Sequence, residues 1–391
     1  YPQLCIDIAT NEDDTNIKER LLKIAVLLAQ KVSNKELGKI ANEMLGDLEY
    51  LHILPPDKNN IAISHLNENH YKKIINYYRL AGQKDKVTTA IKEFEENKKH
   101  HRYIKIQSKI PMKNAQQIYE AVNEYIEQLL EKTSEILILQ LCFDNGSLLF
   151  PPNERVKDTV EKQMEQSDIH KYFSSKLNDF NNNTTSVSHE KLGEHQFYDV
   201  FLQNHTLPFM VELLYRAINK KKISYFQIKK TLEKAAFGIS FDANRGDSVI
   251  NYTWFSLIDI GIQEFFKQLQ KAVKMKQSDW RFTIDFLVPK FEAIFREIVE
   301  NAGGDITRVK ENGDSELKPL EDLFASSIIN EDDIFLFRHT FTKVGWNIRN
   351  NVAHGLYKSF DYTLSKAILV FLCILRLNKV TIYIVNSKNK P

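Results

Sequence analysis

The chain has 391 residues, which is longer than a single hydrophobic core usually grows, so the sequence predicts two or three domains. Hydrophobic residues make up 43% and charged residues 27%, as in ordinary soluble globular proteins, and the scarcity of glycine (13) and proline (10) favours helices. With 53 basic and 51 acidic residues the formal net charge is +2, which excludes a global positive field, so any contact with nucleic acid needs a local basic patch.

The first hundred residues alternate helical patterns with short polar breaks. Apolar side chains at helical spacing predict three helices, in Ile17–Val32, Asn34–Leu51 and His70–Leu80. The stretch Tyr71–Phe94 indicates two helices joined at Gly82, like one tetratricopeptide-type hairpin, and no second copy follows at a fixed period. We therefore expect residues 1–104 to form an irregular region of helical pairs that recognises a protein partner or senses a trigger.

Residues 105–195 are expected to form a middle helical region. The basic cluster Lys98–Arg102 before it is typical of a solvated helix end, with a phosphate-facing edge as the alternative. Ala115–Glu131 has a helical pattern, whereas Ile136–Leu149 fits either a small hairpin or a helix followed by a loop. Polar residues with little to bury predict a linker near residues 174–195, which is the best internal boundary.

The C-terminal domain is expected to span residues 196–391 and to be helical. An aromatic stripe follows one face of the predicted helix Asn251–Lys274, which is typical of a core rather than a ligand platform. Two further helices, one of them strongly apolar, complete a compact bundle and are predicted at Glu331–Val344 and Tyr362–Leu377.

A further helix is predicted between Asn251–Lys274 and Glu331–Val344. Pro289 suits its first turn, and this helix carries Glu292 and Arg296 four residues apart. The plain interpretation of this spacing is an exposed ion pair on one helix face, which would stabilise the fold by only about 0.3 to 0.5 kcal/mol.

The cysteines and the apolar runs indicate the compartment. Three cysteines lie far apart in apolar contexts without metal-ligand spacing, which fits reduced core thiols in a cytoplasmic protein: Cys5, Cys142 and Cys373. The longest apolar run, Ala367–Leu375, falls short of the roughly 20 residues that span a bilayer, so we expect a buried core helix and no membrane partner. No secretory signal is recognisable, but the sequence begins at Tyr1 without a Met, which leaves a preceding segment open.

The segment Asn347–Gly355 places an arginine, asparagines and a histidine between an amphipathic and a strongly apolar stretch. Cleavage of an RNA phosphodiester without a metal needs a group that moves a proton near neutral pH, and histidine, with an unperturbed pKa of about 6.5, suits this task. It also needs a fixed cation for the phosphate charge, a role that suits arginine. The segment is therefore a candidate RNA-cleaving site, and a helix start with asparagine caps is the alternative.

The order of residues around this segment resembles the HEPN superfamily, and more closely an uncharacterised HEPN-related family with the same final motif. The matching residues are Leu287-x-Pro289-x-Phe291-Glu292-x-x-x-Arg296, then Gly303 or Gly304, then Asn347-x-Arg349-Asn350-x-x-Ala353-His354-Gly355. The resemblance covers about residues 250–378, which would form a HEPN-like bundle, and adds nothing secure to residues 1–200.

The resemblance implies a metal-independent endoribonuclease that needs no cofactor and leaves a 2′,3′-cyclic phosphate. It implies a homodimer through the C-terminal domain, in which two Arg–His motifs face one cleft. His354 would be the general acid or base, Arg349 the phosphate clamp, and Asn350 would orient the phosphate or the imidazole. Four other residues are expected to support these groups or to contact the substrate: Glu292, Arg296, Asn347 and Asn351.

The spacing of the two principal residues constrains this interpretation. On a straight helix, five residues turn through about 500°, so Arg349 and His354 would point about 140° apart. For both side chains to reach one site within a single chain, either the segment is not a regular helix or the arginine curls back. A site shared across a two-fold axis does not need the two side chains of one chain to meet, because the arginine and the histidine can come from different subunits.

RNA is thus the expected partner, and RNA cutting held in check until triggered suits a bacterial toxin or anti-phage defence effector, a role implied by the resemblance alone. Two other interpretations stay open: a non-catalytic helical protein that binds RNA or a nucleotide, and a helical scaffold for a partner. The sequence has no phosphate loop and no GxGxxG, HExxH, paired-cysteine or GxSxG motif, which argues against ATPases, dehydrogenases, zinc proteases and hydrolases.

Overall fold

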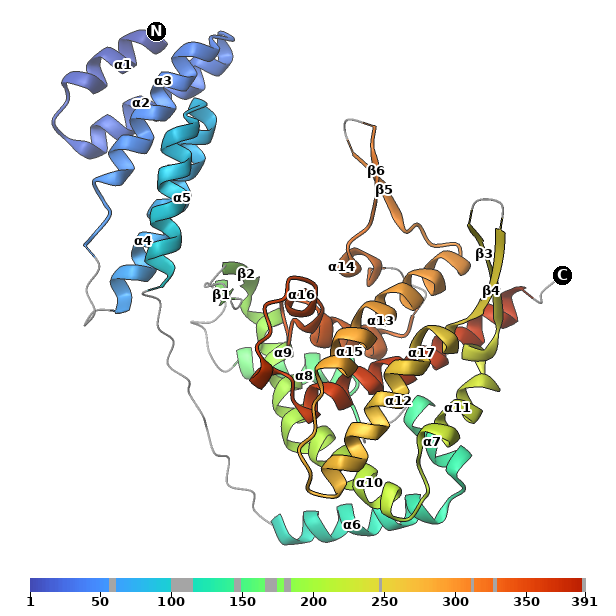
Figure 1. The fold of residues 1–391 in the computed structure, drawn as a ribbon. Helices are drawn as coiled ribbons and strands as arrows, with labels where there is room; N and C mark the ends of the chain where they lie inside the picture. The colour runs from blue at the N-terminus through green and yellow to red at the C-terminus, as the bar shows by residue number, and fades with distance from the viewer. Residues whose placement is uncertain are drawn as a thin grey trace. The chain divides into compact units, whose positions relative to one another are not determined.

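A computed structural model describes most of the chain: residues 1–55, 61–99, 115–143, 149–165, 174–178, 184–245, 248–310, 313–325 and 329–388. The chain divides into two compact units, Tyr1–Ile110 and Pro111–Pro391, which are described separately (Figure 1). Helices dominate the described residues, and the strands form three two-stranded antiparallel hairpins. The prediction of a mostly all-α fold is therefore confirmed.

The first unit consists of consecutive helices, each packed against the next. Their bounds are α1 Pro2–Asn11, α2 Thr15–Lys31, α3 Lys35–Tyr50, α4 Ile61–Ala81 and α5 Lys84–Lys98. The three predicted helices thus form α2, α3 and part of α4, which begins earlier than the pattern indicates. Gly82 joins α4 to α5 with a positive φ of 78°, a conformation that glycine adopts without steric cost. Residues 100–114, which include the end of the basic cluster, lie outside the described residues.

Close packing between α3 and α4 depends on a second glycine. A Cβ atom on Gly46 would lie 2.5 Å from the ring of Tyr78, so only glycine leaves space for this ring. The Tyr78 hydroxyl donates a hydrogen bond of 2.7 Å to Asp47, next to that glycine. The ring contact and the hydrogen bond together fix the pairing of the two helices.

The second unit begins with helices and one hairpin. These elements are α6 Ala115–Glu131, α7 Ser134–Phe143, α8 Asn153–Glu165, β1 Ser174–Asn178, β2 Thr184–Ser188, α9 His189–Phe201, the π-helical turn η2 Leu202–Thr206, α10 Leu207–Asn219, α11 Tyr225–Glu233 and the 3-10 turn η3 Ala236–Gly238.

The rest of the unit contains two further hairpins and the helices that carry the candidate site. These elements are β3 Ser240–Arg245, β4 Ser248–Thr253, α12 Trp254–Val273, α13 Arg281–Asn301, β5 Thr307–Val309, β6 Ser315–Leu317, α14 Leu320–Leu323, α15 Glu331–Phe341, α16 Ile348–Ala353, η4 Ser359–Asp361 and α17 Leu364–Lys388.

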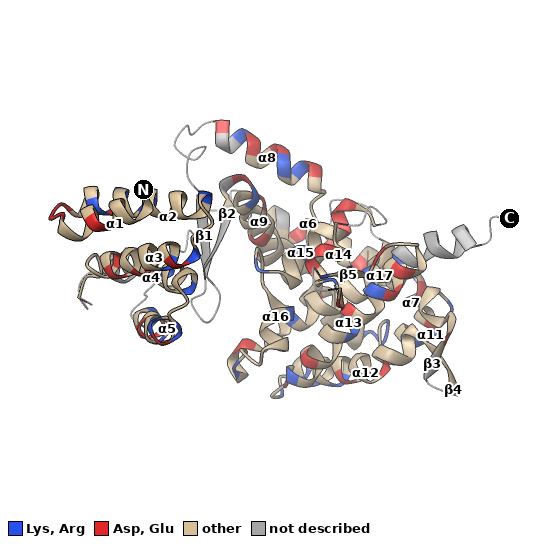
Figure 2. Ribbon diagram, turned by 90° about the horizontal axis from the view of Figure 1, so that it is seen from above, with Lys and Arg blue, Asp and Glu red and all other residues tan. Residues whose placement is uncertain are grey.

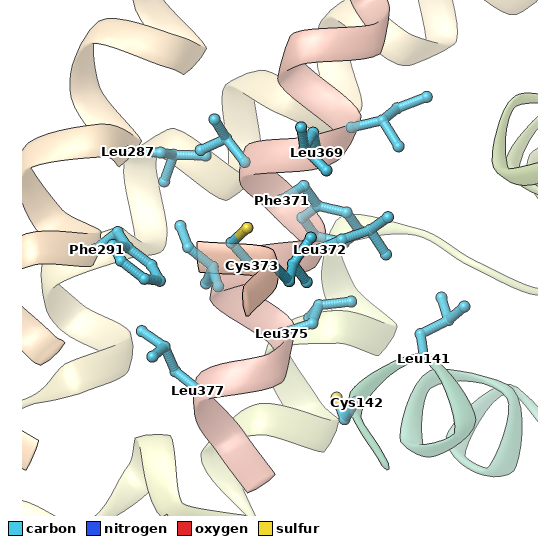
Figure 3. Packing of buried hydrophobic residues seen from close by; sticks show 14 of the residues in the cluster. Leu141, Cys142, Leu287, Phe291, Leu369, Phe371, Leu372, Cys373, Leu375 and Leu377 are labelled. Carbon is cyan, nitrogen blue, oxygen red and sulfur yellow. The ribbon is translucent and has the colours of Figure 1, made fainter. Parts of the chain in front are cut away.

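Helix α17 forms the centre of this unit. Every residue of the apolar run Ala367–Leu375 is fully buried, which confirms the predicted core helix. Figure 3 shows Leu287 and Phe291 of α13 on one side of α17 and Leu141 and Cys142 of α7 on the other. Within the described residues, no helix has the length and apolar character needed to cross a bilayer.

This core includes both of the regions expected from residue 105 onward. Its buried residues run from Ile126 of α6 to Leu377 of α17. The described part of the middle region, from residue 115 onward, and the C-terminal domain at 196–391 therefore belong to one compact unit, because their helices bury apolar side chains against the same partners.

Three local predictions need correction or resolution. The region 174–195 contains β1, β2 and the start of α9 rather than a continuous polar linker, because β1 pairs with β2, which is rich in β-branched residues, and the Ser188 hydroxyl caps α9. Residues up to Phe143 of the ambiguous stretch 136–149 are helical, and 144–148 lie outside the described residues. Pro289 is not in a first turn but lies in the interior of α13, where its missing N–H leaves the carbonyl of Asp285 without the usual helical donor.

Charges of both signs are interspersed over the helices. In Figure 2, basic and acidic residues alternate along α8, as the sequence of this helix also shows. Any binding of a charged partner must therefore depend on small local groups of charged residues rather than on a broad basic face of one helix.

Candidate functional site

The segment that was singled out in the sequence forms the short helix α16 and its two ends. Asn347 precedes the helix with a positive φ of 53°, a left-handed conformation that asparagine tolerates better than most residues. Its backbone N–H donates to the carbonyl of Thr342, and the next side chain, Ile348, is fully buried. The turn and this apolar anchor fix where α16 begins and which side of it faces α13.

Arg349 points from α16 to α13 and binds Glu292 with two N–H groups. The Nε atom lies 2.8 Å from Glu292 Oε2, and Nη2 lies 3.3 Å from Oε1. A third bond, of 3.0 Å, runs from Nη1 to the side-chain oxygen of Asn350. An arginine side chain has five N–H donors, so two remain free of these contacts. The Arg349 side chain is 32% exposed, which leaves it accessible from solvent.

Glu292 binds a second arginine from its own helix. Arg296 Nη2 lies 2.7 Å from Glu292 Oε1, and both side chains are only 14% exposed, so the predicted exposed ion pair is in fact largely buried. Burial by itself raises the pKa of Glu292, but hydrogen bonds from Arg349 and Arg296 outweigh burial and hold this pKa below its ordinary value. The carboxylate therefore stays charged between two guanidinium groups, and the three side chains carry one net positive charge.

One nitrogen of the Arg296 guanidinium lies outside this pair and is left without a described partner. Its Nη1 atom is buried and has no hydrogen-bond partner within the described residues. Such a group normally finds a partner, because leaving a buried donor unsatisfied costs about 1 to 3 kcal/mol. Behind Glu292, Arg296 is too buried to contact a large substrate directly and can only position the carboxylate.

The asparagines of the motif have different surroundings. Asn350 accepts the bond from Arg349 and donates one of 2.7 Å to the side-chain oxygen of Asn347, which connects the arginine to the turn that starts the helix. Asn351 is buried on the other side, and its side-chain oxygen and nitrogen have no hydrogen-bond partner among the described residues. Asn347 and Asn350 are therefore placed to orient Arg349, whereas Asn351 belongs to the core of the unit.

His354 lies at the C-terminal end of α16 and is exposed to solvent. Its backbone N–H donates to the carbonyl of Asn350, which closes the last helical turn. Within the described part of the chain, no hydrogen bond or ion pair engages its imidazole, and none joins it to Arg349. Because α16 is regular up to Ala353, the expected angle of about 140° between Arg349 and His354 applies. One chain by itself does not bring the two groups together.

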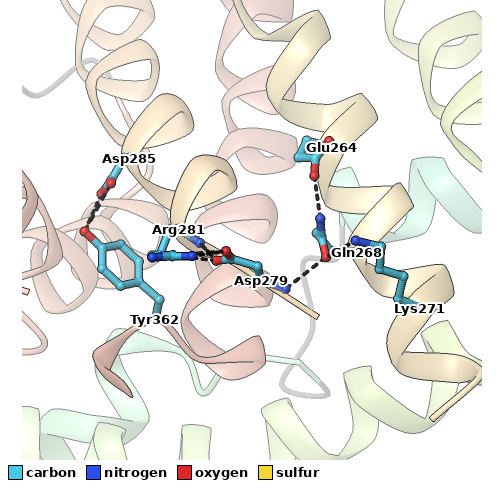
Figure 4. A network of polar contacts seen from close by, with 7 residues as sticks. All are labelled: Glu264, Gln268, Lys271, Asp279, Arg281, Asp285 and Tyr362. Carbon is cyan, nitrogen blue, oxygen red and sulfur yellow. Dashed lines mark hydrogen bonds and ion pairs between the residues drawn. The ribbon is translucent and has the colours of Figure 1, made fainter. Parts of the chain in front are cut away.

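A second contact connects α13 to the chain beyond the motif. The Tyr362 hydroxyl donates to Asp285, at 2.8 and 3.1 Å from its two carboxylate oxygens (Figure 4). Asp285 precedes Glu292 by seven residues, so both carboxylates lie on the same face of α13. Burial raises the pKa of Asp285, and the hydrogen bond from Tyr362 opposes this effect. Asp285 was not predicted from the sequence, although its i, i+7 spacing from Glu292 places both on one helix face.

The loop between α12 and α13 is also held by polar contacts. Gln268 of α12 accepts hydrogen bonds from the backbone of Asp279 and from Lys271, and Asp279 pairs with Arg281 at the start of α13 (Figure 4). These contacts fix the start of the helix that carries Glu292.

The cysteines and carboxylates do not form a metal site in the described residues: no group of three or more His, Cys, Asp or Glu side chains could hold an ion there. Cys142 and Cys373 are free thiols whose pKa burial raises to about 12, so neither is a reactive thiolate.

Comparisons of the chain with protein-family models, with curated proteins and with solved structures found no match. The residues of α13 and α16 and their geometry are therefore the basis for assigning a function.

Proposed function

We propose that the chain is a metal-independent endoribonuclease of the HEPN type, with Arg349 and His354 as its catalytic residues. The observation that carries this proposal is the surface at α16, where an exposed imidazole and a partly exposed guanidinium lie at the two ends of one short helix. Glu292 and Asn350 hold the guanidinium in a defined orientation, as catalysis by positioned charge requires.

In the proposed reaction the 2′-oxygen of a ribose attacks the adjacent phosphorus, and the bond from phosphorus to the 5′-oxygen of the next nucleotide breaks. A base takes the proton of the 2′-hydroxyl and an acid supplies a proton to the leaving oxygen, so the products are a 2′,3′-cyclic phosphate and a 5′-hydroxyl. His354 serves as the acid or the base, because imidazole exchanges protons in both directions near neutral pH.

Arg349 would bind the phosphate as its negative charge grows. The two N–H groups that contact neither Glu292 nor Asn350 are available for phosphate oxygens, and charge-assisted bonds of this kind are about twice as strong as neutral ones. The net positive charge of Glu292 with its two arginines favours a phosphate at this position. Arg296 acts in this account as a positioning residue that holds Glu292.

The complete site would need two copies of the chain. Arg349 and His354 diverge by about 140° on α16, so a two-fold axis beside this helix would pair the arginine of one copy with the histidine of the other. We therefore propose a homodimer through the second unit. The first unit would bind a protein partner or sense a trigger, which suits a cytoplasmic toxin or defence effector whose activity is held in check.

The proposal is tested by incubating the purified full chain with total cellular RNA in EDTA and analysing the fragments and their ends. We expect cleavage to 2′,3′-cyclic phosphate ends by the wild type and its loss in folded His354→Ala and Arg349→Ala variants. The matched controls His205→Ala and Arg155→Ala remove an exposed histidine and an exposed arginine elsewhere in the second unit, and these variants should cleave normally.

Two results would refute the nuclease proposal in different ways. If the wild type binds RNA without cutting it and keeps this affinity without His354, the chain is a non-catalytic binding protein. If it neither binds nor cuts RNA, a scaffold role replaces both.

A further inference from the structure

The first unit contains a cavity of about 350 Å³, which is bordered by the segment after α3 and by the helices α4 and α5. This volume falls within the range of about 300 to 1,000 Å³ that is typical of small-molecule sites. The segment after α3 contributes apolar side chains, and α5 contributes the carboxylates of Glu93 and Glu96. No lysine, arginine or histidine is among the described residues that line the cavity. Its lining therefore combines an apolar wall with negative charge and has no cation of its own.

The apolar wall is formed by residues 53–55, which a buried asparagine holds in place. Asn67 of α4 is only 2% exposed, and its side chain accepts a hydrogen bond of 2.9 Å from the backbone N–H of Leu54. The same side chain donates a bond of 2.8 Å to the carbonyl of Leu54. The Leu54 side chain itself stays exposed. The wall thus has a fixed position and leaves apolar area available to a ligand.

Tyr71 of α4 brings a hydroxyl without a partner to this cavity. The residue lines the cavity and is only 8% exposed, yet its hydroxyl makes no hydrogen bond with any residue that the structure describes. Its ring is held by packing against Tyr50 and Phe94, with ring centroids 6.4 and 6.1 Å away. Polar groups in such surroundings normally have a partner, so this hydroxyl indicates a ligand with a hydrogen-bonding group.

Glu93 brings a carboxylate that is oriented but not neutralised. The Tyr50 hydroxyl donates a hydrogen bond of 2.7 Å to Glu93 Oε2, which fixes the carboxylate. Within the described residues Oε1 accepts no hydrogen bond, and Glu93 forms no ion pair. Glu96 lies one turn further along α5 on the same side of the helix and pairs with Lys99. The charge of Glu93 is therefore left for a cation in the cavity.

The position of these groups selects the kind of cation. Burial, and then the negative charge of Glu93, raises the pKa of Tyr71, which indicates that the two groups lie close together. A guanidinium binds a carboxylate best through both oxygens, and Tyr50 already occupies one of them. A primary ammonium is a compact charge with three donors, for which Glu93 Oε1 and the Tyr71 hydroxyl are acceptors. A bare metal ion would leave the apolar wall unused, whereas an alkyl chain behind the ammonium would cover it.

We propose that this cavity binds a primary alkylammonium, whose charged end contacts Glu93 and the Tyr71 hydroxyl and whose chain packs on residues 53–55. Two sources carry this group: the lysine side chain of a partner peptide and a free diamine. The proposal concerns the first unit alone and does not depend on RNA cleavage at α16.

The test is calorimetric titration of the full chain at constant ionic strength with pentylamine, and with pentanol and ammonium chloride as partial ligands. Pentanol lacks the charge and ammonium chloride lacks the chain, so we expect each to bind at least about tenfold more weakly than pentylamine. Cadaverine and a lysine blocked at both ends represent the two sources. The tighter of these two binders identifies whether the cavity fits a free diamine or a peptide side chain.

Two variants separate binding from folding. Tyr71→Phe keeps the packed ring and removes a hydroxyl without a described partner, so it should keep the wild-type stability and weaken pentylamine binding about threefold or more. Glu93→Gln keeps the shape but removes the charge, so it should weaken binding at least about tenfold. The matched control Glu36→Gln removes an exposed carboxylate of α3 outside the cavity and should bind normally.

Three results would overturn the proposal. The first is a wild type that does not bind pentylamine at millimolar concentration. The second is pentanol binding as tightly as pentylamine, and the third is wild-type affinity in both Glu93→Gln and Tyr71→Phe.

Discussion

Replacement of Glu292 by Gln tests the central geometry of the candidate site. The substitution keeps the shape of the side chain but removes the charge that Arg296 and Arg349 share. The two short bonds, of 2.7 and 2.8 Å, are each worth about 1.5 to 3 kcal/mol because both partners are charged. The glutamine oxygen can keep one neutral bond of about 1 kcal/mol, so we expect the second unit to lose about 2 to 5 kcal/mol of unfolding free energy.

The loss should depend on pH in a defined direction. The pKa of Glu292 is lowered in the folded chain, so its stabilisation is fully present above the ordinary pKa of 4.5 and is lost as the pH falls through the folded value. The difference between wild type and Glu292→Gln should therefore be constant near neutral pH and shrink below about pH 4.5.

Urea unfolding followed by tryptophan fluorescence measures this difference in the full chain. All three tryptophans lie in the second unit, so the signal reports that unit alone: Trp254, Trp280 and Trp346. The matched control is Glu233→Gln, which removes an exposed i, i+4 pair with Lys229 at 3.7 Å and should cost less than about 0.5 kcal/mol. Equal effects of Glu292→Gln and Glu233→Gln would refute the account of a buried shared carboxylate.

The remaining stability predictions concern the core around α17 and use the same unfolding measurement. Asp333 is fully buried and pairs with Arg376 at 2.6 Å, so Asp333→Asn should cost about 3 to 5 kcal/mol, and a loss below 1 kcal/mol would contradict a buried ion pair. A Cβ atom on Gly261 would lie 2.4 Å from Leu287, so Gly261→Ala should separate α12 from α13 and cost about 1 to 3 kcal/mol, whereas an unchanged midpoint would show that this crossing is looser than the structure indicates.

Local periodicity predicted the helical core better than it predicted the site. The run Ala367–Leu375 was recognisable as a buried helix because nine consecutive positions lack any charge, and α17 buries all of them. The i, i+4 spacing of Glu292 and Arg296 likewise predicted their pairing. Both signals lie within one helix, where the 3.6-residue period fixes which side chains are neighbours.

Features that depend on distant residues were not predicted. The resemblance led us to expect Glu292 near the Arg349 motif, 57 residues away, but no local pattern indicates that the two residues form an ion pair or that this pair is buried. The pairing of His195 with His339 spans 144 residues and has no local pattern. Pro289 was assigned to a helix start because proline is favoured there, but packing of α13 against α12 and α17 continues the helix through it.

The most direct test of the proposed function is a subunit-mixing experiment on RNA cleavage. We expect folded Arg349→Ala and His354→Ala chains each to be inactive, and their equimolar mixture, after dissociation and reassembly, to recover about a quarter of wild-type cleavage. Recovery is predicted because a mixed dimer joins the intact arginine of one copy to the intact histidine of the other. A wild type that cleaves RNA together with a mixture that stays inactive would contradict the shared site.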